Sequence, residues 1–204
     1  MLKYPIIVFE GIEGSGKSFH INCIQKHLKE KRVKFIKFRE PGGSINSEKI
    51  RKLILNKKSN FKNLTDLFLY MAARNENFHN IINKNHKKKV LLIDRFTDST
   101  IAYQHYGMNL NKKLIVNLNK IILKNIKPNF TFLNIVSMKN LISRLNKRPK
   151  NRYDKFNLKF YNNVQKGFIK LAKNKKNYMI INSNKEISLN KKIILNKINS
   201  LLSI

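Results

Sequence analysis

Residues 11–18 limit the possible folds of this chain more than any other segment. They read Gly11-Ile12-Glu13-Gly14-Ser15-Gly16-Lys17-Ser18 and satisfy the spacing G-x-x-x-x-G-K-[ST], between a short apolar run and a helical pattern. The glycines let successive backbone N–H groups converge on a phosphate, and the N-terminus of the following helix adds positive potential. Lys17 reaches the β- and γ-phosphates, and Ser18 supplies a hydroxyl for Mg²⁺. The motif predicts a nucleotide-phosphate loop on a strand–loop–helix unit.

Short apolar runs alternate with amphipathic segments along the whole chain, which is typical of β-α-β units. The predicted strands are residues 5–10, 34–38, 90–94, 130–136 and 178–182. The predicted helices are residues 17–31, 45–55, 65–84, 112–124, 139–147, 154–173 and 187–202. We therefore expect an α/β fold of the P-loop NTPase class, with a five-stranded parallel sheet flanked by helices.

The length and composition indicate one compact domain over residues 1–204. The chain has 204 residues, 42% of them hydrophobic, which suffices for a real core. Its single cysteine, Cys23, excludes an intramolecular disulfide and a cysteine-based zinc site, and is typical of a reducing compartment. No apolar run near the start approaches the roughly 20 residues that span a bilayer. We expect a cytoplasmic protein with no membrane segment.

The net charge of +32 comes from 43 Lys and Arg against 11 Asp and Glu. The surplus is mostly Lys, spread along the chain together with Asn and Ile. These three residues share A/T-rich codons, so drift in codon usage competes with recruitment of polyanions as the explanation. Basicity alone therefore assigns no function. The few acids, in contrast, mark candidate sites, among them Glu10, Glu13, Glu40, Asp94 and Asp98.

Asp94 and the scarce arginines favour a small kinase. Asp94 ends an apolar strand at the carboxyl edge of the sheet, where it can lie near Mg²⁺, so the motifs together imply a nucleoside triphosphate with magnesium. A kinase must also hold a second anion in line with the γ-phosphate, which suits the bidentate guanidinium. The chain has eight Arg against thirty-five Lys. Arg39, Arg74 and Arg95 flank the motif segments, and Arg144, Arg148 and Arg152 lie in a basic region, residues 144–154, that could close as a lid.

Four segments in this order resemble bacterial thymidylate kinases. They are residues 9–18 (FEGIEGSGKS), 38–43 (FREPGG), 72–74 (AAR) and 94–104 (DRFTDSTIAYQ). The likeness runs from the first strand to about Gly167, roughly four fifths of the chain. It implies a phosphate-loop fold with a five-stranded parallel sheet, a homodimer, and the production of dTDP from dTMP and ATP with Mg²⁺.

The resemblance also implies a role for individual residues. Three arginines would hold the dTMP phosphate, namely Arg39, Arg74 and Arg95. Glu13 would contact the sugar 3′-hydroxyl or a metal-bound water. The base and sugar would be held by Tyr70, which stacks on thymine, by Thr100 and Gln104, which hydrogen-bond to it, and by Tyr103, which crowds the 2′ position. Residues 11–18 would bind ATP, and Ser18 and Asp94 would hold the metal.

The lid is expected to supply positive charge to the transferring group. Some members of the family carry an arginine in the phosphate loop, but residues 12–15 here include none. Arg148 and Arg152 are therefore the expected catalytic residues beside Lys17 and Arg95, with Arg144 interpreted as a helix residue. The lid sequence Asn151-Arg152-Tyr153-Asp154 departs from the family, which usually has an acid before this Arg and a Glu at the end.

Two alternatives remain open at this point. Another P-loop nucleotide kinase or a deoxynucleoside kinase would share the loop, although three phosphate-binding arginines have little purpose if the acceptor is uncharged. A basic nucleic-acid-binding ATPase would explain the charge and predicts steeply salt-dependent binding to polyanions. The sequence contains no recognisable nucleic-acid-binding module, so we expect dTMP, and not nucleic acid, as the partner.

Overall fold

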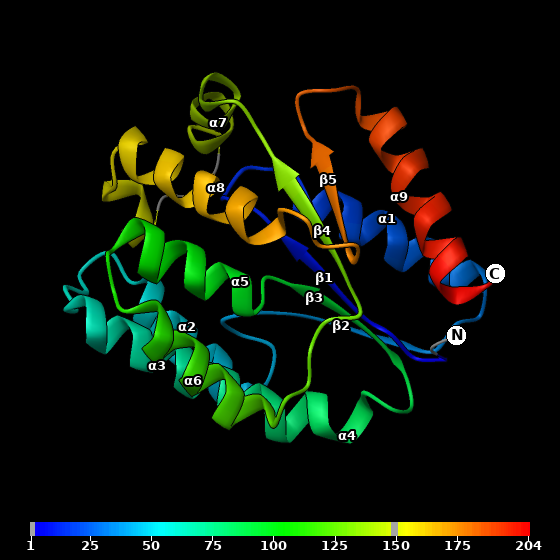
Figure 1. Ribbon diagram of the computed structural model, residues 1–204, viewed down its shortest axis with the longest axis horizontal. Coiled ribbons are helices and arrows are strands. Elements are labelled where there is room, and N and C mark those ends of the chain that lie inside the picture. The colour runs from blue at the N-terminus through cyan, green and yellow to red at the C-terminus, as the bar shows by residue number, and fades with distance from the viewer. Residues whose placement is uncertain (1–2, 148–150) are drawn as a thin grey trace.

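The computed structural model describes residues 3–147 and 151–204, and its centre is a parallel five-stranded sheet (Figure 1). The strand order is β2-β3-β1-β4-β5, and every neighbouring pair is parallel. The strands are β1 Ile6–Glu10, β2 Phe35–Arg39, β3 Val90–Asp94, β4 Phe130–Ile135 and β5 Tyr178–Asn182. All five predicted strands are confirmed within one residue at either end.

The helices fill the connections between strands, as the periodicity predicted. Their bounds are α1 Lys17–Glu30, α2 Ile45–Leu55, α3 Asn63–Asn77, α4 Asn83–Asn85, α5 Thr97–Thr100, α6 Lys112–Leu123, α7 Met138–Leu145, α8 Leu158–Ala172 and α9 Ile187–Leu202. A π-helical turn, Phe78–Ile82, joins α3 to α4, so the predicted helix over residues 65–84 is one continuous helical segment. The five-stranded P-loop α/β fold is confirmed.

Two helical stretches differ from the prediction. Residues 97–107 are helical, as α5 and a π-helical turn over Ile101–Gly107, because Glu10 on β1 supplies the acceptor that starts this helix. The predicted helix over residues 154–173 begins instead at Leu158. It follows a separate 3₁₀ turn, Arg152–Lys155, whose N-terminus is capped by the side chain of Asn151.

The strands bury apolar side chains on both faces, as expected for an all-parallel sheet. On one face, Ile7 and Phe9 of β1 pack with residues of α1 and α9, which lie together on one side in Figure 1. On the other face, Ile6 and Val8 pack with Phe78 and other residues near the helical segments on the opposite side. This alternation follows the two-residue period of a strand. It fixes the register of β1, whose end carries the phosphate loop.

Parallel strands bring their carboxyl ends to one edge of the sheet, which positions the site. The phosphate loop follows β1, the turn containing Glu40 follows β2, and Arg95 follows β3. The register places Phe9 opposite Asp94, so the ends of β1 and β3 lie side by side. Three of the motif segments thereby meet.

The contact between α8 and residues 101–107 depends on two glycines. A Cβ added to Gly167 of α8 would lie 2.5 Å from the Tyr106 ring, and one added to Gly107 would lie 2.6 Å from Phe160. Both distances are shorter than real Cβ contacts. The close approach presses residues 103 and 104, which line the site, against the helix behind them.

We predict that Gly167→Ala lowers stability. Crowding against the Tyr106 ring costs about 1–3 kcal/mol, and the better helix propensity of Ala returns up to about 1 kcal/mol. Urea unfolding should show a net loss of roughly 1–2 kcal/mol, smaller in a Tyr106→Ala background. Lys166→Ala, at the exposed neighbouring position, is the matched control and should change stability by less than about 0.5 kcal/mol. An unchanged midpoint for Gly167→Ala would show that the two elements can separate freely.

Candidate active site

The phosphate loop curls around the ammonium of Lys17. Gly11 has φ +134°, and a Cβ there would lie 2.2 Å from the carbonyl oxygen of Asn134, so only glycine fits this turn. Lys17 Nζ donates to the carbonyl oxygens of Gly11 at 3.0 Å and Ile12 at 2.9 Å. The ammonium is therefore held inside the loop, where a bound phosphate would lie.

The charge of Lys17 is destabilised by its surroundings. Burial, and then the nearby Arg95 guanidinium, lowers the pKa of Lys17 to about 7, although Asp94, Glu13 and Glu10 oppose the shift. The side chain is 6% exposed. An added polyanion would favour the charged form, so phosphate binding and protonation of Lys17 are coupled.

Ser18 and Asp94 form an oxygen-rich corner beside the loop. Ser18 Oγ donates to Asp94 Oδ2 at 3.5 Å, and Asp94 Oδ1 is buried with no hydrogen-bond partner among the described residues. Mg²⁺ prefers such hard oxygen ligands and is usually held by one or two protein groups together with substrate phosphates. Across residues 3–147 and 151–204, no three His, Cys, Asp or Glu side chains cluster as a metal site of their own. The donors present fit Mg²⁺ bound with a nucleotide.

Two neighbouring cavities open at this edge of the sheet. The phosphate-loop cavity is lined by Glu13, Gly14, Gly16, Lys17, Ser18, Phe19, Arg39, Glu40, Arg51, Asp94, Arg95 and Arg144. The inner cavity is lined by Glu13, Glu40, Pro41, Arg51, Leu55, Tyr70, Arg74, Arg95, Phe96, Ser99, Thr100, Tyr103, Gln104 and Tyr153. The cavities share Glu13, Glu40, Arg51 and Arg95. A group held at this shared wall can reach both.

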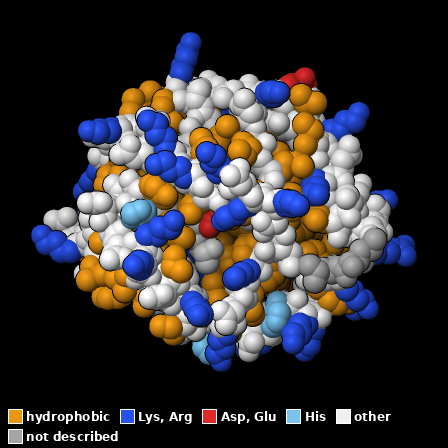
Figure 2. Space-filling model, in the orientation of Figure 1, with side chains coloured by type: hydrophobic (Ala, Val, Ile, Leu, Met, Phe, Trp, Pro, Cys, Tyr) orange, Lys and Arg blue, Asp and Glu red, His pale blue; other side chains and the backbone are white. Residues whose placement is uncertain are grey.

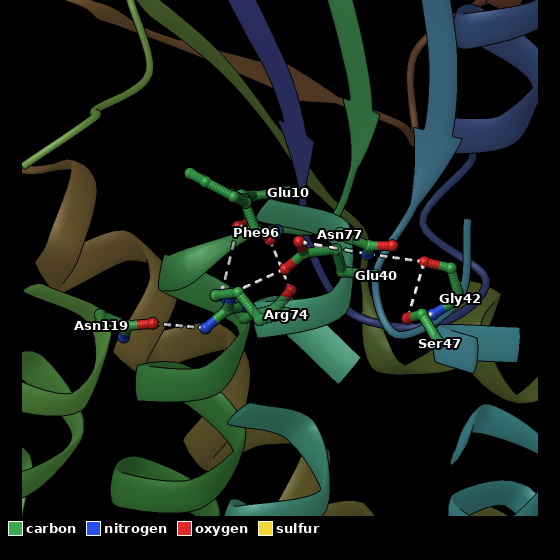
Figure 3. Close-up of polar contacts among 9 residues, drawn as sticks. Glu10, Glu40, Gly42, Ser47, Arg74, Asn77, Phe96 and Asn119 are labelled. Atoms are coloured by element: carbon green, nitrogen blue, oxygen red, sulfur yellow. Dashed lines mark hydrogen bonds and ion pairs between the residues drawn. The ribbon is translucent and has the colours of Figure 1, made fainter. Parts of the chain in front are cut away.

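Arg74 is fixed by polar partners on both sides (Figure 3). Its Nε donates to Glu40 Oε2 at 2.7 Å, and its Nη1 donates to Asn119 Oδ1 at 2.5 Å. The side chain is 2% exposed, and its guanidinium lies 5.4 Å from the centroid of the Phe96 ring. Asn77 in turn donates to Glu40 and to the carbonyl oxygen of Gly42, which ties the turn after β2 to α3. These contacts place a rigid cation in the inner cavity.

Arg95 lies at the junction of the two cavities. It has φ +66°, in the left-handed region, which costs a residue with a side chain about 1–2 kcal/mol. Its Nη1 donates to the Gly11 carbonyl at 2.9 Å and to Ser99 Oγ at 3.3 Å, and its guanidinium lies 5.2 Å from the centroid of the Tyr103 ring. The backbone turn thus aims this cation back at the phosphate loop.

The inner cavity is also lined by unpaired polar groups and by aromatic side chains. Gln104 is 1% exposed, and neither its Oε1 nor its Nε2 has a hydrogen-bond partner in the described part of the chain. Tyr103 packs edge-on against Tyr153, and Tyr70 donates its hydroxyl proton to Tyr153 Oη at 2.7 Å. Burial, and then Asp66, raises the pKa of Tyr70, so this hydroxyl stays protonated. A buried amide with free donor and acceptor is suited to a planar polar ligand.

The structure thus brings together Glu13, Tyr70, Arg74, Arg95, Thr100, Tyr103 and Gln104 at the inner cavity. It places two other predicted residues elsewhere. Arg39 is half exposed, pairs with Glu48 at 3.2 Å and borders only the phosphate-loop side. Arg152 donates to buried Asp66 on α3 and borders neither cavity. Arg148 lies outside the described residues.

Two further arginines line the cavities, although the sequence pattern had assigned neither of them a role there. Arg51 on α2 lines both cavities and donates to the Pro41 carbonyl at 2.7 Å. The scarcity of arginine, which drew attention to Arg74, applied equally to Arg51. Arg144, interpreted as an ordinary helix residue, donates to the carbonyl oxygens of Gly14 and Ser183 at 2.9 and 2.8 Å and lines the phosphate-loop cavity.

Comparison with known proteins decides the family. The family model for thymidylate kinase matches residues 9–194. The chain belongs to the thymidylate kinase family. The thymidylate kinase of Thermosipho melanesiensis is 36% identical over 182 residues, 89% of this chain and 90% of the relative. That of Mycoplasma capricolum is 36% identical over 187 residues, 89% and 88% of the two chains.

A solved structure agrees with the sequence comparison. The crystal structure of thymidylate kinase from Ehrlichia chaffeensis has a TM-score of 0.78 and 30% identity, and the match covers 96% of this chain and 98% of that one. As a member of the thymidylate kinase family, the chain transfers the γ-phosphate of ATP to dTMP. The predicted family, fold and reaction are confirmed. Within the described residues, no helix is both long and apolar enough to cross a bilayer.

We predict that the thymidylate kinase takes up a proton when it binds a nucleoside triphosphate at pH 8. At that pH Lys17 is mostly neutral in the free protein, because its pKa is about 7, and the bound phosphates restore its charge. Calorimetric titration in buffers of different ionisation enthalpy should detect uptake of up to about one proton per site. The variant Lys17→Gln removes the group, whereas Lys29→Gln, on the exposed face of α1, leaves uptake unchanged. Equal uptake by Lys17→Gln would assign the proton to another group.

Proposed function

We propose that the inner cavity binds dTMP with its phosphate toward Lys17 and its thymine ring toward Gln104. The observation that supports this proposal is the combination of charged and hydrogen-bonding side chains that line the inner cavity. Arg95 borders the phosphate loop, whereas Arg74 and the unpaired amide of buried Gln104 line only the inner cavity. A nucleoside monophosphate has the matching order of groups, an anion at one end and a hydrogen-bonding ring at the other.

The base end of the cavity suits thymine. The Gln104 amide can donate to a ring carbonyl and accept from the ring N–H, and Thr100 lies beside it. The Tyr70 ring offers a face for stacking one helical turn before Arg74. Tyr103, buried against Tyr153, narrows the space near the sugar and disfavours a ribonucleotide.

The phosphate-loop cavity is proposed to hold the phosphates of ATP. Its backbone N–H groups and Lys17 would bind the β- and γ-phosphates, and Ser18 with Asp94 would hold Mg²⁺, which neutralises phosphate charge when bound. In the transfer, a dTMP phosphate oxygen bonds to the γ-phosphorus as the bond to the β–γ bridging oxygen breaks, giving dTDP and ADP. Arg95 borders both cavities, which supports a contact of its guanidinium with both phosphates.

The origin of the lid charge stays a proposal. Glu13 Oε1 accepts from Asn151 at 3.2 Å, so a residue of the lid segment already touches the phosphate loop. Arg152 would have to exchange Asp66 for substrate phosphate to act in transfer, whereas Arg144 already lines the phosphate-loop cavity. We keep Arg148 and Arg152 as proposed lid cations and add Arg144.

We also propose one domain over residues 1–204, with the lid at about 144–154.

The buried cations distinguish the proposal from its rivals. Arg95 donates to two neutral oxygens at the junction of the cavities, the Gly11 carbonyl and Ser99 Oγ, and an uncharged nucleoside would bring it no anion. This argues against a deoxynucleoside kinase. The nucleic-acid-binding ATPase finds no support in the cavity, which is a small pocket lined by side chains from α2, α3 and α5.

We predict turnover of dTMP that depends on Arg74 and Arg95. The measurement is ADP release from ATP with Mg²⁺ in the presence of dTMP, dUMP, UMP, CMP, AMP or thymidine. Arg74→Ala and Arg95→Ala should each lower kcat/KM for dTMP by about 100-fold or more, because each removes a buried charge from the acceptor phosphate. Arg39→Ala should cost less, since Arg39 lies half exposed at the rim.

Arg32→Ala, at an exposed position away from both cavities, is the control and should retain full activity. Turnover of thymidine in place of dTMP would support a deoxynucleoside kinase. ATPase activity that rises with added RNA or DNA, without turnover of any monophosphate, would contradict the proposal and make the +32 charge the main clue.

The homodimer is proposed to form through α3 and α6, which lie side by side (Figure 1). Leu64 and Phe68, one turn apart on α3, are 43% and 51% exposed, and Ile121 on α6 is 72% exposed. Exposed apolar side chains on two packed helices offer a surface that can pack against a second subunit. The predicted cytoplasmic location is kept as part of the proposal, in keeping with the single Cys23.

We predict that Phe68→Glu converts the dimer into monomers. The change places a carboxylate in the proposed apolar contact, where it would be desolvated without a partner. Native mass spectrometry of wild type and variant measures the oligomeric state. Ile187→Glu, at a 57% exposed apolar residue of α9, is the matched control and should leave the dimer intact. A monomeric wild type, or a dimer that survives Phe68→Glu and falls apart with Ile187→Glu, would overturn the assignment.

A further inference from the structure

Glu10, the last residue of β1, is a buried acid to which the proposed reaction assigns no role. It is 1% exposed and lines neither cavity. Its Oε1 accepts from the backbone N–H groups of Phe96 at 2.8 Å and Ser99 at 3.2 Å, and its Oε2 accepts from Ser99 Oγ at 2.5 Å. One carboxylate thus accepts three hydrogen bonds from the segment that follows Arg95.

These contacts lead directly to the Arg95 side chain. The Ser99 hydroxyl has a single proton, which it donates to Glu10, so its lone pairs are directed away from that carboxylate. Arg95 Nη1 donates to the same hydroxyl oxygen at 3.3 Å. Without Glu10 the hydroxyl could rotate and present its proton to the guanidinium, which would repel it. Glu10 therefore ensures that Ser99 Oγ presents a lone pair, and not its proton, to the Arg95 guanidinium.

The backbone of Arg95 is fixed by the same strand. Its N–H donates to the Phe9 carbonyl at 2.9 Å, and the next N–H, of Phe96, donates to Glu10. These two bonds from adjacent residues of β1 hold the turn in which Arg95 has φ +66°. In a turn that is intrinsically unfavourable for Arg, the position of the guanidinium depends on such external bonds.

We infer that Glu10 is the positioning residue for the acceptor phosphate, holding the Arg95 guanidinium at the junction of the two cavities through Ser99 and the Phe96 N–H. The inference rests on the proposed role of Arg95 in binding dTMP. Glu10 contacts no substrate and acts only through these neighbours. Its carboxylate must be ionised, since a protonated oxygen would compete as a donor with the N–H and hydroxyl groups that it now accepts from.

The electrostatic surroundings make that ionisation sensitive to pH. Burial, and then the carboxylate of Asp98, raises the pKa of Glu10 to about 7, against the hydrogen bonds from Ser99 and Phe96 and the charge of Arg95. Lys17 and Tyr178 of β5 also interact electrostatically with Glu10, and Tyr178 donates to Asp98 Oδ2 at 2.5 Å. Binding of dTMP should therefore weaken as the pH falls below about 7.

The test compares the kinetics of Glu10→Gln and Ser99→Ala with wild type at pH 8. Gln has the same shape but one acceptor oxygen fewer, so Arg95 loses its orientation. Glu10→Gln should lower kcat/KM for dTMP by about 10- to 100-fold and leave KM for ATP within about twofold. Ser99→Ala should show the same selectivity, and the double variant should lose little more than Glu10→Gln, because both residues act along one chain of contacts.

Asp98→Asn is the matched control, since it changes a buried carboxylate next to Ser99 that bonds to Tyr178 and not to Ser99. It should retain KM for dTMP at pH 8. In wild type, a plot of kcat/KM for dTMP against pH should have an acidic limb, a fall at low pH as Glu10 becomes protonated. In Asp98→Asn this limb should lie at lower pH, because the variant removes a charge that raises the pKa of Glu10. Glu10→Gln should abolish that limb.

The outcomes separate this inference from the proposed function. If wild type does not turn over dTMP, or Arg95→Ala has no effect, the proposed function fails. If wild type is active, but Glu10→Gln raises KM for both substrates equally or keeps the acidic limb, the positioning role is wrong. If Glu10→Gln does not fold, selective loss of dTMP binding in Ser99→Ala together with the shifted limb in Asp98→Asn supports the inference, and their absence overturns it.

Discussion

The parallel pairing of β1 with β3 is the contact on which the whole site depends. It places the ends of the two strands side by side, with Phe9 opposite Asp94. The residues just beyond are then forced together, and Arg95 reaches the Phe9 carbonyl with its backbone and the Gly11 carbonyl with its side chain, each at 2.9 Å. The two cavities therefore share a wall because two strands share hydrogen bonds.

A second constraint is the use of scarce acids to hold arginines in place. Glu40 fixes buried Arg74, and Glu10, itself buried, holds Arg95 through Ser99. Burial of a single charge costs several kcal/mol, and a hydrogen-bonded partner offsets that cost while it restricts geometry. Arg39, paired with Glu48 at the surface, shows the contrast, since an exposed pair contributes little and restrains little.

The sequence was informative where local pattern and tertiary structure agree. The buried strands read as apolar runs, and the phosphate loop is a local motif, so both were predictable. The helix over residues 97–107 was missed because its start depends on Glu10, which is distant in sequence. The partners of Arg144 and Arg152, the Gly14 carbonyl and Asp66, are likewise set by long-range contacts that no spacing reveals. A site role for Arg51 could have been predicted from the sequence, because arginine is rare in this chain and each arginine was therefore a candidate.

The buried acids also limit how far the composition of this chain can drift. One base change, G to A at the first codon position, converts Glu to Lys and Asp to Asn, the residues in surplus here. At exposed positions, where Lys and Arg are scattered over the visible face with few acids among them (Figure 2), that step exchanges one solvated side chain for another. At Glu10 or Glu40 it would set an ammonium against the Arg95 or Arg74 guanidinium in a site that excludes water. Mutational pressure toward A/T can therefore replace exposed acids of this enzyme with Lys and Asn. It cannot replace the buried carboxylates of Glu10 and Glu40, which hold the arginines of the site.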